Sequence, residues 1–208
     1  QESACPAWYS GLMLKLLIFA IASCSAAATA AFSALPIERD WVIGPLIRGK
    51  NYSVNMPLRP EPTRTGWSFD FPYPNRAAGH VHYVTFDPGS LAGKSQIAVR
   101  YRVQARKGTE FVPQERPDLP GTVSLYFQRS GDNWSARGKY NFYRWYAPNH
   151  SVHEIEVGVH EMVVRFDDPA WTPVSGPYTR GNSLRAFEDA LDRASSIGLV
   201  FGSTSARG

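Results

Sequence analysis

The stretch TVSLYFQR, residues 122–129, decides the fold. Apolar and polar side chains alternate along it, which is the period of a β-strand with one face in a core and one in solvent. The apolar face consists of Val123, Leu125 and Phe127. The polar face consists of Thr122, Ser124, Tyr126 and Gln128. We therefore expect a half-buried strand whose second set of side chains faces solvent.

The same alternation recurs on both sides of this stretch. Residues 96–104 place an apolar set, Ile97, Val99, Tyr101 and Val103, opposite Arg100, Arg102 and Gln104. Residues 158–166 turn Met162, Val164 and Phe166 inward. Further strands are expected at 66–71, 80–86, 138–146 and 197–201, and residues 41–43 open the fold. Links rich in Gly and Pro separate these segments, as is typical of short antiparallel strands.

One segment has helical spacing instead. Leu184, Phe187, Leu191 and Ala194 recur at the helical period, and Asn182 or Ser183 can cap the start. The fold class is thus all-β: an antiparallel two-sheet sandwich, jelly-roll-like, with one short helix near the C-terminus. Because the strand at 197–201 comes so close to the end of the sequence, we expect closing strands to be missing there. A truncated C-terminal end would leave an open edge.

The N-terminal region predicts export. Met13 and Lys15 precede a short apolar run that ends in small residues at Ala28-Thr29-Ala30, the pattern of a secretory signal peptide over residues 13–30. The run is too short to span a bilayer, which needs about 20 residues. Residues 1–12 are interpreted as a read-through extension, and residues 31–208 as one sandwich domain. An alternative is a lipobox at residues 21–24, in which Cys24 carries a lipid anchor.

Composition narrows the classes of partner. The formal net charge is +4, but the basic residues are scattered and form no polybasic run, which argues against a nucleic-acid partner. Residues 31–208 contain no Cys, so thiol chemistry and disulfides are excluded there. Phe, Trp and Tyr make up 13% of the chain, which suits both a large core and flat platforms for sugar rings.

Several segments are similar to an uncharacterised group of exported bacterial proteins. They are residues 67–72, 80–83, 121–128 and 131–134. The general shape over residues 41–202 resembles the jelly roll of galactose-binding-like domains and carbohydrate-binding modules. That resemblance implies sugar binding as the leading class, although such a fold hosts many functions and no binding residue can be transferred by position.

The polar faces of two predicted strands are the first candidate site. If both strands lie in one concave sheet, their side chains line a shallow groove formed by Arg100, Arg102, Tyr126 and Gln128. Arg and Gln could hydrogen-bond sugar hydroxyls or a carboxylate, and Tyr could stack under a ring. His82 beside them would favour a lyase. The alternative is an ordinary solvated face.

The densest aromatic stretch is the second candidate site. In a strand over residues 138–146, Tyr143 and Trp145 point to one face and Tyr140, Phe142, Arg144 and Tyr146 to the other. We expect Tyr143 and Trp145 to form an exposed platform. Trp134 follows the turn at 131–133 and could close over a ligand. The alternative is core packing.

Metal and hydrolytic sites are weaker candidates. His80 and His82 share a strand face, but the Glu of a cupin-like site is absent, and Asp87 or Asp132 could at most serve a Ca²⁺ loop. Glu154 and Glu156 lie about 7 Å apart along a strand, which favours a charged edge over a hydrolytic pair. No cofactor is expected.

Three functions remain open. The first is an exported, non-catalytic carbohydrate-binding sandwich with a poly- or oligosaccharide as partner. The second is a polysaccharide lyase or glycoside hydrolase of jelly-roll type, with Arg neutralising a uronate and Tyr or His as base. The third is a structural domain of the cell envelope. The sequence does not indicate an oligomeric state.

Overall fold

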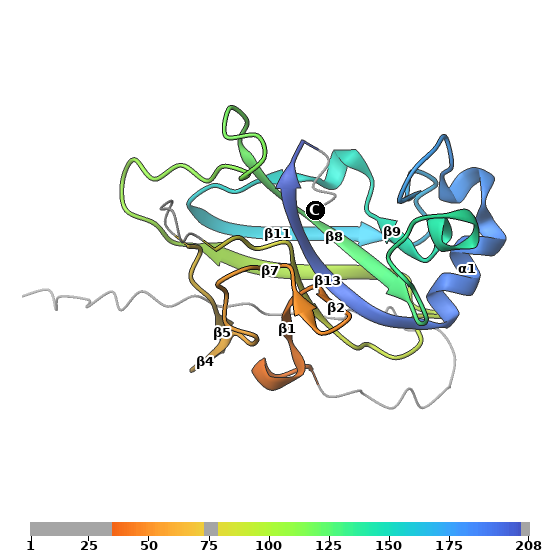
Figure 1. Cartoon of the computed structure of the whole chain (residues 1–208), viewed down its shortest axis with the longest axis horizontal. Coiled ribbons are helices and arrows are strands. Elements are labelled where there is room, and N and C mark those ends of the chain that lie inside the picture. The colour runs from red at the N-terminus through yellow and green to blue at the C-terminus, as the bar shows by residue number, and fades with distance from the viewer. Residues whose placement is uncertain (1–34, 73–78, 205–208) are drawn as a thin grey trace, which may run out of the picture.

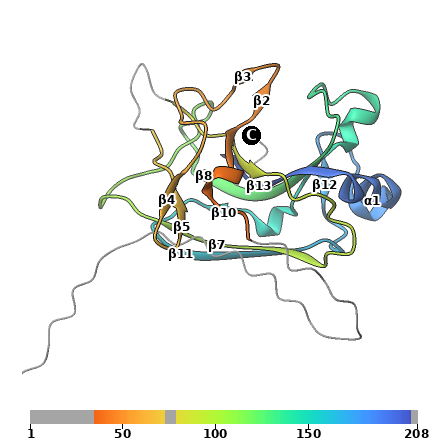
Figure 2. The same cartoon turned by 90° about the horizontal axis from the view of Figure 1, so that it is seen from below.

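The computed structural model describes residues 35–72 and 79–204, and within them two antiparallel sheets face each other (Figure 1 and Figure 2). The larger, seven-stranded sheet has the order β1-β6-β13-β8-β9-β12, with β10 paired to β8. Its strands are β1 (Val42–Gly44), β6 (Tyr83–Phe86), β8 (Gly121–Arg129), β9 (Arg144–Tyr146), β10 (His153–Glu154), β12 (Thr172–Pro173) and β13 (Ala194–Ser203). The smaller sheet pairs β7 (Gln96–Val103) with β11 (Gly158–Arg165).

Short elements complete the described part of the chain. The hairpins are β2 (Leu46–Ile47) with β3 (Lys50–Asn51), and β4 (Glu61–Thr63) with β5 (Gly66–Ser68). The helices are α1 (Leu184–Asp192) and the 3-10 turns η1 (Glu38–Asp40), η2 (Gly138–Phe142), η3 (Asn149–Ser151) and η4 (Arg180–Asn182). The predicted class, an antiparallel all-β sandwich with one short helix near the C-terminal end, is confirmed in these residues.

Aromatic side chains fill the space between the two sheets. The Phe127 ring on β8 lies 5.5 Å from Trp171 and 5.3 Å from Phe187 of α1, measured between ring centroids. Trp145 and Trp171 are fully buried beside them. Rings of this size remove large apolar areas from water, so this cluster dominates the packing of α1 onto the sheet.

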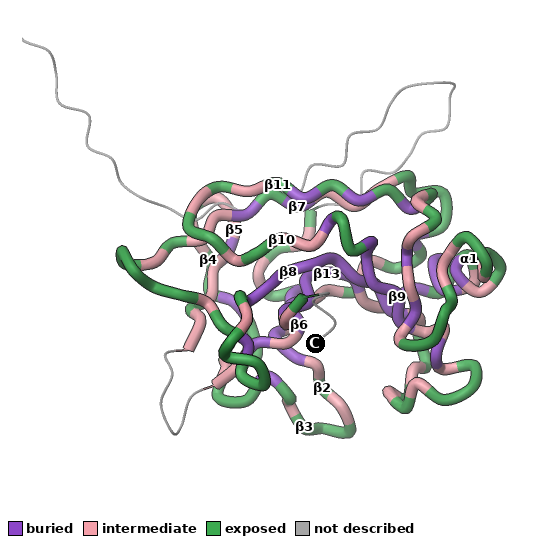
Figure 3. The backbone as a smooth tube through the Cα atoms, turned by 90° about the horizontal axis from the view of Figure 1, so that it is seen from above, coloured by how far each residue is buried: buried purple, intermediate pink, exposed green. Residues whose placement is uncertain are grey.

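The predicted faces of β7 and β11 are correct. Met162 and Val164 of β11 are buried, as are Val99 and Tyr101 of β7. The Phe166 side chain, just past β11, also points inward and is only 4% exposed. The backbone tube in Figure 3 alternates between buried and more exposed colours along β11, whereas β8 is buried nearly throughout.

Strand β13 lies in the middle of the larger sheet. It pairs with β6 on one side and with β8 on the other, where the ladder runs from Ala194 opposite Arg129 to Ser203 opposite Gly121. The expectation of an unpartnered edge at residues 197–201 is therefore wrong. Two non-local pairings close both sides of this strand, and one of the partners, β6, lies more than a hundred residues earlier in the chain.

Three other strand predictions need correction. Residues 138–146 form η2 followed by the short β9, because the Asn141 side chain turns back to the backbone of Ser175 through hydrogen bonds of 2.9 and 3.0 Å. The strand expected at 66–71 ends at Ser68, and the one expected at 80–86 begins at Tyr83.

The N-terminal predictions fall outside the described residues. These are the extension at 1–12, the signal peptide at 13–30 and the lipid anchor on Cys24. Within the described ranges, no helix has both the length and the apolar character needed to cross a bilayer.

The close approach of β13 to β6 generates a stability prediction. A Cβ on Gly198 would contact the carbonyl oxygen of Val84, which belongs to the backbone and cannot move aside, and the φ of +156° adds strain. We expect Gly198→Ala to lower the free energy of unfolding by about 3 kcal/mol. Urea denaturation measures it. Gly89→Ala is the control, since Gly89 also has positive φ but has open space around it. Equal losses in both variants would contradict the packing argument.

Candidate ligand-binding site

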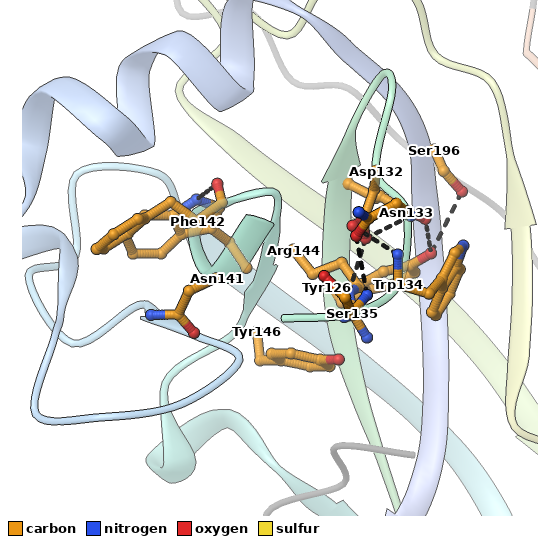
Figure 4. Close-up of polar contacts among 12 residues, drawn as sticks. Tyr126, Asp132, Asn133, Trp134, Ser135, Asn141, Phe142, Arg144, Tyr146 and Ser196 are labelled. Carbon is orange, nitrogen blue, oxygen red and sulfur yellow. Dashed lines mark hydrogen bonds and ion pairs between the residues drawn. The ribbon is translucent and has the colours of Figure 1, made fainter. Parts of the chain in front are cut away.

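Polar and aromatic side chains gather on the face of the larger sheet that points away from the core. Alternation along each strand puts them there, because the residues between them point into the sandwich. The set comes from β6, β8, β9, β13 and the loop after β8. We name it the outer-face cluster: Tyr83, Tyr126, Gln128, Asp132, Trp134, Arg144, Tyr146 and Ser196. Figure 4 labels six of its members: Tyr126, Asp132, Trp134, Arg144, Tyr146 and Ser196.

A buried ion pair lies at the centre of the cluster. Arg144 Nε is 2.8 Å from Asp132 Oδ2, and the two side chains are only 8% and 1% exposed. Gln128 Nε2 donates to the same carboxylate oxygen over 2.9 Å. The Asp132 carboxylate thus lies between the Arg144 guanidinium of β9 and the Gln128 amide of β8. These contacts fix the loop after β8 against the sheet.

The loop after β8 folds back over this pair. Asp132 Oδ1 accepts the backbone N–H of Trp134 at 2.9 Å, and the Trp134 ring lies 4.6 Å from the Arg144 guanidinium. The edge of the ring also meets Tyr83, at 5.7 Å between centroids. Trp134 has φ of 63° and Ala136 has φ of 55°, a left-handed conformation that costs non-glycine residues free energy.

Tyrosine hydroxyls form the second half of the cluster. Tyr83 and Tyr146 share a hydrogen bond of 3.0 Å between their hydroxyls, and the Tyr126 hydroxyl donates to Gln128 Oε1 over 3.1 Å. Burial raises the pKa of Tyr83 well above its ordinary value, and burial likewise raises the pKa of Tyr126. Both phenols therefore stay protonated at neutral pH, where they can donate hydrogen bonds but cannot serve as bases.

Three buried polar atoms on this face make no hydrogen bond of good geometry among the described residues: Arg144 Nε, Arg144 Nη2 and Ser124 Oγ. Arg144 Nε is nevertheless ion-paired with Asp132, so Arg144 Nη2 and Ser124 Oγ are the two without any polar partner there. An unsatisfied buried donor costs about 1–3 kcal/mol, and more for a charged group. Such atoms are uncommon in folded proteins, so each of them is a potential contact for a bound molecule or a water.

The structure separates the residues of the first predicted groove. Tyr126 and Gln128 lie together in the outer-face cluster, but they are buried, so the expected solvent-facing side of residues 122–129 is wrong. Arg100 and Arg102 lie on β7, which belongs to the other sheet and turns them to the opposite side of the sandwich. The loop carrying Asp132 and Trp134 is what covers β8.

The prediction that Tyr143 and Trp145 form an exposed aromatic platform is also wrong. Trp145 is fully buried in the core between the sheets. Tyr143 is half-buried, with the Arg129 guanidinium 4.2 Å from its ring and Tyr140 at 5.0 Å. The two side chains diverge because residues 138–142 turn as a 3-10 helix before β9 begins. Trp134 lies over the Arg144 guanidinium, and its closing over a ligand stays a prediction.

The outer-face cluster contains residues that sequence reasoning did not select. Arg144, Asp132, Tyr83 and Tyr146 were not among the ligand-binding candidates. The sequence held a signal for two of them. Arg144 and Tyr146 are two residues apart on β9, so both point to the side of the strand opposite to Trp145, which is in the core. The Asp132–Arg144 pair joins a loop to a neighbouring strand, and no local pattern encodes such a contact.

Histidine and carboxylate candidates lie elsewhere. His82 is half-buried near His80, 4.5 Å between ring centroids, and burial lowers its pKa with the His80 charge adding to the effect. Among the described residues, no group of three His, Cys, Asp or Glu side chains is arranged to hold a metal ion. Glu154 and Glu156 line a separate hollow of about 430 Å³.

Comparison of the chain with protein-family models, with curated proteins and with solved structures finds no match. The resemblance to galactose-binding-like domains and carbohydrate-binding modules therefore stays a prediction. The candidate site rests on the geometry of this chain alone.

The buried ion pair makes a second stability prediction. Asp132→Asn leaves the Arg144 charge uncompensated, so we expect the free energy of unfolding to fall by about 3–5 kcal/mol. Chemical denaturation at pH 7 measures it. Asp118→Asn is the matched control, because Asp118 pairs with Arg116 at 2.9 Å on the exposed surface, where solvent screens the pair. A loss in the control as large as that in Asp132→Asn would contradict the role of burial.

Proposed function

We propose that this protein is an exported, non-catalytic carbohydrate-binding β-sandwich, and that the outer-face cluster binds the sugar. The observation that carries the proposal is the buried Arg144, whose Nη2 lacks a partner among the described residues although it lies within a set of aromatic rings and hydroxyls. Sugars offer the complementary groups, because their hydroxyls accept such donors and their C–H faces pack on rings.

Trp134 is the ring that a sugar meets first. It is half-buried, whereas Tyr83, Tyr126 and Tyr146 beneath it are at most 5% exposed. A sugar reaches Arg144 when this ring turns aside about its side-chain bonds and packs against the face of the sugar, while the Trp134 N–H stays bonded to Asp132. Asp132 stays in place and keeps the guanidinium oriented.

Binding without catalysis fits the proton chemistry of the cluster. A lyase needs a base, but burial raises the pKa of Tyr83 and Tyr126. A hydrolase needs two carboxylates across one bond, but Asp132 is the one carboxylate of the cluster and is held by Arg144. His82 and Arg102, which a lyase groove would require beside Tyr126, are not part of the cluster.

A glycan array tests the proposal. The wild-type protein should bind a subset of oligosaccharides, and both Trp134→Ala and Arg144→Lys should weaken that binding at least tenfold. Lysine keeps a positive charge for Asp132, so Arg144→Lys removes the planar guanidinium fork without stranding the carboxylate. Thermal melting of each variant verifies folding.

Tyr178→Ala is the control for the array, since Tyr178 is 43% exposed and lies outside the cluster. It should bind like the wild type. Failure of the wild-type protein to bind any glycan counts against the carbohydrate-binding class. Glycan binding that survives both Trp134→Ala and Arg144→Lys counts against the outer-face cluster as the site.

A further inference from the structure

A second hollow lies at the end of the sandwich next to α1. Its volume is about 290 Å³, and it opens between α1, the end of β11 and residues 92–95. Two backbone hydrogen bonds fix these walls: Leu91 N–H to the Leu191 carbonyl, 2.9 Å, and Phe166 N–H to the Ser95 carbonyl, 3.0 Å. We name it the basic hollow after its three cations, Lys94, Arg165 and Arg180. Its lining also includes Asp167, Glu188, Phe166, Phe187 and Leu191.

The charges of the basic hollow are not balanced. Asp167 is engaged by Arg165, whose Nε donates to its carboxylate over 2.8 Å. That hydrogen bond lowers the pKa of Asp167, and the Arg180 charge adds a smaller effect. Together with Glu188, two carboxylates face three cations around the hollow. The surplus positive charge favours an anion.

Two of the three cations are available. In the described part of the chain, neither Lys94 nor Arg180 forms an ion pair. The Arg180 guanidinium lies 5.5 Å from the centre of the Phe187 ring, and its Nε is buried with no hydrogen-bond partner among the described residues. The ring thus holds the guanidinium in place, and its Nε donor makes no hydrogen bond to the described residues.

We propose that the basic hollow binds a phosphate or sulfate monoester carried by a single sugar ring. Arg180 offers the planar fork that matches a tetrahedral oxyanion, and Lys94 adds a mobile point charge. Phe166, Phe187 and Leu191 form an apolar floor for the carbon skeleton. The volume is at the lower end for small-molecule sites, which limits the ligand to about one ring.

Isothermal titration calorimetry at low ionic strength tests this with three probes: glucose 6-phosphate, glucose 6-sulfate and glucose. At least one ester should bind, glucose should bind at least tenfold more weakly, and the stronger ester identifies the oxyanion. Arg180→Gln and Lys94→Gln should each weaken ester binding about tenfold. Lys107→Gln is the control, because it removes the same charge from an exposed position outside the hollow.

The variants keep the result interpretable. Lys94 is exposed in a loop, so its replacement does not threaten folding, and Arg180→Lys should restore part of the affinity lost in Arg180→Gln. Trp134→Ala should leave ester binding unchanged, which separates this site from the outer-face cluster. Absence of ester binding, or wild-type affinity in either Arg180→Gln or Lys94→Gln, overturns the proposal.

Discussion

The antiparallel ladder between β8 and β13 is the constraint on which the other features depend. It is the most extensive pairing in the larger sheet, and it fixes which side chains of both strands face the core. With Phe127 opposite Ile197 and Leu125 opposite Leu199, the apolar residues fall on one side. The intervening residues, Tyr126 among them, must then fall on the other, because a one-residue slip would reverse both sets. The outer-face cluster is therefore a consequence of the register that builds the core.

The sequence was informative where a pattern is local. Alternation located β7 and β11 with their correct inward residues, and helical spacing located α1. Alternation also identified the core side of β8 through Val123, Leu125 and Phe127. It could not show that the other side of β8 is covered, since that depends on a loop folding back and on its Asp132 meeting Arg144.

The errors have the same physical origin. Residues 138–146 alternate like a strand, yet Asn141 forms hydrogen bonds to Ser175, more than thirty residues away, and the backbone turns to allow them. The predicted platform failed because Trp145 lies on the core side of β9 and Arg144 on the outer side, and alternation does not show which of the two sides is covered. Likewise Arg100 was expected beside Tyr126, but sheet membership is set by which strands pair, and alternation carries no information about pairing partners.

A buried ion pair of this kind is poor evidence for a purely structural role. Replacing such a pair with packed apolar side chains is often neutral or stabilising, because desolvating two charges offsets much of their attraction. The outer face nonetheless carries Arg144 Nη2 and the Ser124 hydroxyl, neither of which has a hydrogen-bond partner in the part of the chain that the structure describes, and a loop with two left-handed non-glycine residues. Each of these features costs free energy. Single features of the same kind occur elsewhere among the described residues, at Trp41 Nε1 and Arg48 for example, but on this face they lie together with a buried ion pair. A face selected only for stability would be expected to lose them, which is the physical reason for proposing a binding site on this side of the sandwich.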